Sequence, residues 1–225
     1  MAATQDDAEQ RAAYWPVPIV RALPAAAFAL VITFSADHSA RFGLLTFGVF
    51  AIATGILITV MAAVRLAGSR VRSFVLAQGV MTVAAGVLSL VVNDGGVRYL
   101  FFVVTAFAAI TGFLELYSGL RSRGRFVGSG DWVTVGVLTA AAALVFLLVP
   151  PAFTQNFRGP DGVTRVLDAS VVAVGLLGAY GAIVAVYLVI AGLSARWGTQ
   201  SVPSQSVPSQ PVPSRSAATE SETRA

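Results

Sequence analysis

Apolar residues in this chain fall into six long blocks that are separated by short polar connections. The two clearest blocks, 73–92 and 99–120, follow one another and are joined by a turn at 93–96 that contains two glycines. A helix rises about 1.5 Å per residue, so each block is long enough to cross the roughly 30 Å hydrocarbon core of a bilayer. The same criterion predicts four further spans, at 18–34, 42–64, 132–149 and 170–193. The pattern predicts an all-α integral membrane protein with six transmembrane helices.

Short sequence elements recur between these blocks at a fixed spacing. Gly55, which follows a threonine in the second block, recurs in the fourth block as Gly112, 57 residues later. Gly79 in the third block recurs as Gly136 in the fifth at the same spacing, and a weaker third copy of the first element lies 69 residues beyond Gly112, at Gly181. Such self-similarity is typical of repeat architectures. We therefore expect three helical-hairpin repeats, at about 17–66, 73–120 and 132–194.

The two ends of the chain have a different composition. Residues 1–16 carry charged side chains and no apolar run, which predicts a solvated leader rather than a secretory signal. Residues 198–225 contain a five-residue Ser/Val/Pro period repeated three times. A tract of this kind buries too little apolar surface to offset its ordering entropy, so we expect a disordered cytoplasmic tail. The tail is either inert or a docking segment for a cytoplasmic partner.

Composition and charge support a bilayer as the main partner. Hydrophobic residues make up 56% of the chain, charged residues only 12%, and the mean hydropathy is +0.77, which would leave a water-soluble globule short of polar surface. The net charge of +4 comes from arginines at the ends of apolar blocks rather than from one basic face. This pattern excludes a nucleic-acid partner and indicates contact with lipid headgroups.

The distribution of arginines predicts the orientation. Nine arginines flank the even-numbered connections and the two ends of the chain, and four lie on the odd-numbered connections. The positive-inside rule then places both termini in the cytoplasm. All fifteen basic residues are arginine, and the chain is rich in alanine, valine and glycine, which suggests a high-GC bacterial genome. The predicted location is the bacterial plasma membrane.

The sequence offers little for catalysis. There is no cysteine, His38 is the only histidine, no nucleotide-binding glycine motif opens a helix, and no two carboxylates lie within the spans. We expect a non-enzymatic protein without a cofactor, a metal site or catalytic residues. His38 lies in an external connection, where its ordinary pKa makes it a candidate pH-responsive residue, although a solvated loop histidine is the simpler interpretation.

One carboxylate, Glu115, lies inside a predicted span, and an ionisable group in a membrane helix is a functional hypothesis by default. Glu115 and Gln78 each lie five residues from the cytoplasmic end of their blocks. This shared depth predicts a hydrogen bond between them, with Arg121 or Arg123 reaching back to the carboxylate. Arg21 is expected to extend to the headgroups instead. The cluster is either a structural pairing or a proton-binding or gating site.

Two further features leave alternatives open. The connection 150–169 is longer than the other external connections, and we expect a plain loop with Asp168 as the N-cap of the last span. Small residues at four-residue spacing, such as Gly178 and Ala182, let helices approach closely. They serve packing within the chain or a homo-oligomer.

The repeats resemble those of the HdeD-like small bacterial membrane proteins. The resemblance rests on Gln78, Gly79 and Gly86 in the first helix of a repeat and on the run 111–121 that ends the second helix, and it covers roughly 21–196. It implies a non-enzymatic role in envelope stress or acid tolerance and supplies no catalytic residues. The alternatives are a small transporter or channel that uses Glu115 and Gln78, and a membrane scaffold that recruits a partner through the tail.

Overall fold

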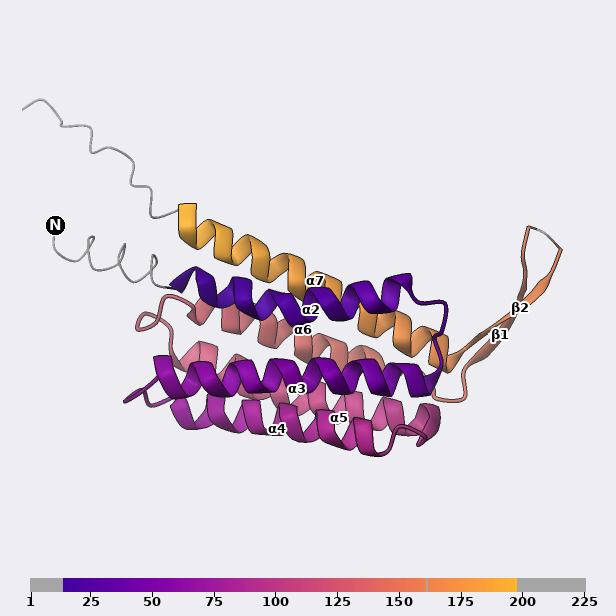
Figure 1. The fold of residues 1–225 in the computed structure, drawn as a ribbon, viewed down its shortest axis with the longest axis horizontal. Helices are drawn as coiled ribbons and strands as arrows, with labels where there is room; N and C mark the ends of the chain where they lie inside the picture. The colour runs from indigo at the N-terminus through magenta and orange to yellow at the C-terminus, as the bar shows by residue number, and fades with distance from the viewer. Residues whose placement is uncertain (1–13, 161, 198–225) are drawn as a thin grey trace, which may run out of the picture.

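The computed structural model describes residues 14–160 and 162–197, which form a bundle of six long helices and one small β-hairpin (Figure 1). Each predicted span is confirmed, with its ends within four residues of the expected positions. The helices are α2 (Pro16–Phe34), α3 (Ala40–Arg65), α4 (Arg72–Val91), α5 (Gly96–Arg121), α6 (Ser129–Leu148) and α7 (Ala169–Trp197).

All six helices are long and apolar enough to cross a membrane, so the chain is a multi-pass membrane protein. The start of α2 and the end of α7 lie at one end of the bundle together with the α3–α4 and α5–α6 connections (Figure 1). We call this the terminal end, and the opposite end, which carries the β-hairpin, the β-hairpin end. Most of the predicted leader and the whole predicted tail lie outside the described residues.

The helices pack most closely in pairs that join one predicted hairpin to the next. These pairs are α3 with α4, α5 with α6, and α2 with α7. A Cβ added at Gly55 would lie 2.8 Å from the carbonyl oxygen of Gly79, and one added at Gly112 would lie 3.2 Å from that of Gly136. Both glycine pairs therefore allow close helix contact. The three-hairpin repeat stays a prediction, and the closest contacts lie between the expected units rather than within them.

The long connection at the β-hairpin end is more ordered than expected. It forms an antiparallel pair of strands, β1 (Thr154–Arg158) and β2 (Thr164–Asp168), so the expectation of a plain loop is wrong. A tight turn accounts for the pairing, since the amide of Gly162 donates to the carbonyl of Gly159 at 2.9 Å and Gly162 has a φ of +74°. The strands leave the bundle as a projecting arm (Figure 1).

The predicted N-cap at Asp168 is confirmed. Its Oδ1 accepts hydrogen bonds from the backbone amides of Ser170 at 2.9 Å and Val171 at 3.0 Å, and from the Ser170 hydroxyl at 2.7 Å. These bonds favour the charged carboxylate, so they lower the pKa of Asp168 from its ordinary value. The capped helix start fixes the point where the projecting arm joins α7.

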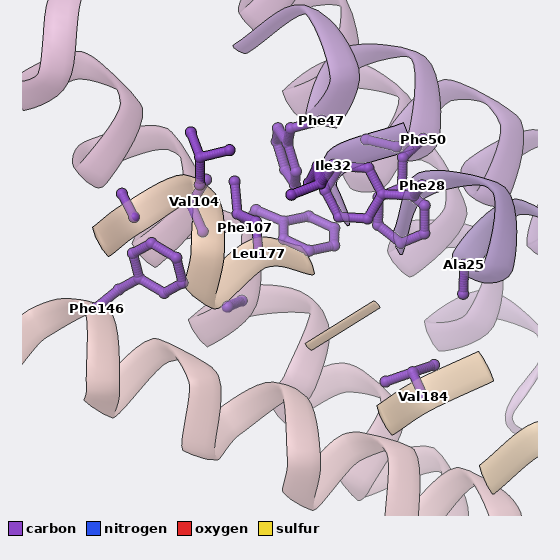
Figure 2. Close-up of a cluster of buried hydrophobic side chains, with 14 of the residues drawn as sticks. Ala25, Phe28, Ile32, Phe47, Phe50, Val104, Phe107, Phe146, Leu177 and Val184 are labelled. Carbon is purple, nitrogen blue, oxygen red and sulfur yellow. The ribbon is translucent and has the colours of Figure 1, made fainter. Parts of the chain in front are cut away.

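Buried aromatic side chains cluster in the core (Figure 2). The helix bounds place them in the half nearer the β-hairpin end, with Phe47 early in α3 and Phe146 late in α6. Phe28 stacks on Phe50 with ring centroids 4.6 Å apart, and Phe47 meets Phe107 edge to face at 5.1 Å. A void of only about 10 Å³ lies among these rings, and Phe146 also lines it. We call this packed layer the phenylalanine plug. It closes the centre of the bundle on that side.

Candidate functional site

A buried ion pair lies in the interior of the bundle, in the half nearer the terminal end. The guanidinium of Arg21, on α2, donates from Nη2 to Oε1 of Glu115, on α5. Arg21 is 7% exposed and Glu115 is 5% exposed. An unpaired charge at this depth is expensive in hydrocarbon, and the pair compensates both charges.

The arginine partner of Glu115 differs from the predicted one. Arg121, the last residue of α5, and Arg123, just after the helix, are both exposed, and the carboxylate is paired with Arg21, so the prediction that either reaches back to it is wrong. The expectation that Arg21 extends to the headgroups is also wrong, because its side chain points into the bundle. α2 packs mainly against α7 and α3, and the long side chains of Arg21 and Glu115 meet across the interior of the bundle. Depth along a single helix does not reveal which side chain lies opposite.

The predicted hydrogen bond between Gln78 and Glu115 is confirmed. Nε2 of Gln78, on α4, donates to Oε2 of Glu115 at 2.9 Å, and Gln78 is buried. Each carboxylate oxygen thus has its own donor, one charged and one neutral. We call Arg21, Gln78 and Glu115 the polar cluster.

A cavity of about 360 Å³ lies between the polar cluster and the terminal end. Its base contains all three cluster residues, and at its other side it reaches the exposed arginines Arg65 and Arg125. We call it the binding cavity. The rest of its wall is mainly apolar: Val17, Ile58, Met61, Ala62, Leu66, Val75, Phe126, Val127 and Trp132, with Tyr14 as a further polar member.

One wall of the binding cavity is held by a tyrosine–aspartate network that the sequence analysis missed. The hydroxyl of Tyr14 donates to Oδ2 of Asp131 at 2.9 Å, and the hydroxyl of Tyr187 donates to Oδ1 at 3.2 Å. The Tyr14 ring also meets Phe126 edge to face at 5.5 Å. Burial, with Asp131 nearby, raises the pKa of Tyr14 above its ordinary value. Tyr14 therefore stays neutral and ties the chain before α2 to the start of α6.

A smaller chamber of about 30 Å³ lies on the other side of the polar cluster, towards the phenylalanine plug. Hydroxyl groups line it, and those of Thr139 and Tyr180 are 2.8 Å apart. Two buried polar atoms beside it, Nε of Arg21 and Oγ1 of Thr54, lack a hydrogen-bond partner within the described residues. A space of this size is large enough for one water molecule.

The positions that line this chamber follow the spacing of the predicted repeats. Arg21 and Gln78 are 57 residues apart, and a further 57 residues lead to Val135, which also lines the chamber. Ile58 and Glu115 are likewise 57 residues apart. This recurrence is the signal that could have identified Arg21 from the sequence, since it is the counterpart of Gln78.

His38 lies far from the polar cluster. It is half-buried in the α2–α3 connection at the β-hairpin end, close in sequence to Arg41, whose Nε lies 3.5 Å from Oδ1 of Asp94 in the α4–α5 connection. The pH-responsive role of His38 stays a prediction. Among the residues that the structure describes, no group of three or more His, Asp or Glu side chains is arranged to hold a metal ion.

Comparison of the chain with family models, curated proteins and solved structures gives no match. The HdeD-like resemblance therefore stays a prediction from the sequence. The function has to be argued from the polar cluster and the cavity beside it.

Proposed function

We propose that this chain is a non-enzymatic membrane protein that binds a small molecule in the binding cavity and admits it from the terminal end. The observation that carries the proposal is the position of the buried Arg21–Glu115 pair at the base of a cavity of about 360 Å³. Ligand sites in proteins combine a largely apolar wall with a few convergent polar groups, as this cavity does. A buried charge pair in a membrane bundle is itself a functional candidate.

The opposite side of the polar cluster supports binding rather than free conduction. Beyond the cluster, the chamber has a volume of only about 30 Å³, and the void within the phenylalanine plug has a volume of about 10 Å³. A solute that enters from the terminal end meets the ion pair and then tightly packed rings. A site that is open on one side only fits a receptor or carrier better than a continuously open channel.

Cysteine labelling tests access to the cavity, because the chain contains no cysteine of its own. Val75 lines the binding cavity and Val104 lines the void in the plug, and both are buried. In purified protein in nanodiscs, N-ethylmaleimide should label the Val75→Cys variant quickly and the matched Val104→Cys variant hardly at all. Equal labelling rates in the two variants would contradict a cavity that opens on one side.

A small transporter is the second candidate, and the one-sided cavity favours it. Alternating access requires a central site that opens to one side of the membrane at a time. Proteoliposomes with a trapped pH-sensitive dye would report proton flux. Flux in the wild type that disappears in the Glu115→Gln variant supports transport, and equal flux in both removes Glu115 from that mechanism.

The biological setting that we propose is the bacterial plasma membrane, with both termini in the cytoplasm and a role in envelope stress or acid tolerance. It rests on the arginine distribution and on the HdeD-like resemblance of the sequence. Deletion of the gene should lower survival under acid or envelope challenge, with complementation by the intact gene as the control. Unchanged survival in cells that normally express the protein would refute this role. The tail-mediated scaffold falls on residues outside those described.

A further inference from the structure

A second cavity, of about 290 Å³, lies at the terminal end and is lined by four arginines. The arginines are Arg65, Arg70, Arg121 and Arg125, all exposed. We call this space the arginine cleft. Within the described part of the chain its lining includes the serines Ser69 and Ser122 but no acidic residue.

The arginine cleft adjoins the binding cavity. Arg65, Leu66, Arg125 and Phe126 line both spaces, so the two arginines stand at the boundary between a strongly positive region and a mainly apolar one. A guanidinium presents donors in a planar fork that matches phosphate and carboxylate oxygens. Burial of apolar ligand surface against the apolar side chains of Ile58, Val75 and Trp132 lowers the free energy of the complex.

We propose that the cleft and the cavity together bind an anionic amphiphile. Its phosphate or carboxylate lies among the arginines of the cleft, and its apolar chain enters the binding cavity towards Arg21 and Glu115. This inference rests on the proposed binding function and adds the chemical class of the ligand. The shared chemistry occurs in an anionic membrane lipid and in a free acyl or alkyl phosphate.

The simpler explanation for these arginines is orientation of the chain in the membrane. That explanation predicts no preference for a ligand with both a charge and a chain. It also treats all exposed arginines of the same connection alike. Arg123 provides the comparison, because it is exposed on the same connection as Arg121 and Arg125 but lines neither space.

Protection of the Val75→Cys variant from N-ethylmaleimide tests the ligand class. In phosphatidylcholine nanodiscs, octyl phosphate should slow labelling and inorganic phosphate should have no effect. The concentration of octanol that gives the same protection should be about tenfold higher than that of octyl phosphate. The tenfold figure corresponds to the loss of one charge-assisted contact, on the order of 1.5 kcal/mol.

Adding phosphatidylglycerol to the nanodiscs distinguishes the two ligand sources. Protection by this lipid assigns the site to a membrane lipid, and protection by octyl phosphate alone assigns it to a free amphiphile.

Charge removal in the same background tests the arginine cleft. Arg121→Gln should raise the octyl phosphate concentration for half-protection about tenfold, and the matched Arg123→Gln change should leave it unaltered. Equal protection by octanol and octyl phosphate, or equal effects of the two arginine changes, would overturn the ligand class while leaving cavity binding intact. If Val75→Cys is not labelled at all, the binding function itself fails.

Discussion

Arg21 and Glu115 are separated by 94 positions in the sequence, and their side chains form an ion pair inside the bundle. The pair joins the first described helix to the fourth, and Gln78 adds a third helix through its hydrogen bond at 2.9 Å. Most of the bundle's other contacts are apolar or between small residues. The polar cluster is therefore a directional connection among three helices of a bundle in which most packing is non-directional.

Removing one charge of the pair should destabilise the protein strongly. Arg21→Leu leaves the Glu115 carboxylate buried without a cation, which costs about 3 to 5 kcal/mol in comparable pairs. Unfolding of purified protein in mixed micelles would measure the loss. The double variant Arg21→Leu with Glu115→Leu should recover much of the stability, because no charge then stays buried.

Arg121→Gln serves as the control and should change the stability little, since Arg121 is exposed. A loss in Arg121→Gln as large as in Arg21→Leu would contradict the observed pairing.

Removing the neutral donor should have a smaller effect. Gln78→Leu deletes the hydrogen bond to Oε2 of Glu115 but leaves the Arg21 contact in place. We expect a loss of about 1 to 2 kcal/mol in the same unfolding assay. In Glu115→Leu protein the Gln78→Leu change should have less effect, because the acceptor is gone. Additive losses in the double variant would show that the two side chains do not interact.

A glycine at the α5–α6 contact should tolerate no side chain. A Cβ at Gly136 would lie 2.5 Å from the backbone nitrogen of Leu116, whereas one at Gly175 would meet nothing within 4 Å. Gly136→Ala should therefore destabilise by about 1 to 3 kcal/mol through overpacking. Gly175→Ala, the same change in an open position of α7, should be neutral or stabilise by up to about 1 kcal/mol. Equal effects on the thermal midpoint would argue against the close contact between α5 and α6.

The N-cap of α7 should make stability depend on pH in the acid range. Hydrogen bonds from Ser170 and Val171 lower the pKa of Asp168 in the folded state. Its contribution is therefore present above the unfolded pKa, about 3.9 for an ordinary aspartate, and is lost as the pH falls through the lower folded value. Asp168→Ala should cost about 0.5 to 2 kcal/mol at neutral pH. The difference between wild type and variant in thermal unfolding should shrink towards pH 3, and a constant difference would contradict the charged cap.

Apolar length and polar depth explain which features the sequence could predict. The lengths of the apolar blocks predicted the six helices. The equal distances of Gln78 and Glu115 from the ends of their blocks predicted that the two side chains lie at the same depth. Neither quantity indicates which helix lies opposite Glu115, so Arg21 was assigned to the headgroups although it is 57 residues before Gln78. The contact of Tyr14 with Asp131 depends on how the chain before α2 folds back over α6, and no local pattern encodes that placement.

The pairing of the first and last helices, α2 and α7, has a consequence for synthesis of the chain. A ribosome produces α2 first, but its closest packing partner emerges last, and the carboxylate that neutralises Arg21 arrives only with α5. Arg21 is the sixth residue of α2, so its insertion penalty is smaller than the roughly 2.5 to 3.5 kcal/mol of an arginine at a helix centre, but its charge stays uncompensated until α5 enters the membrane. Nascent chains that end before residue 115 should therefore hold α2 only loosely in the bilayer, and completion of α7 secures it.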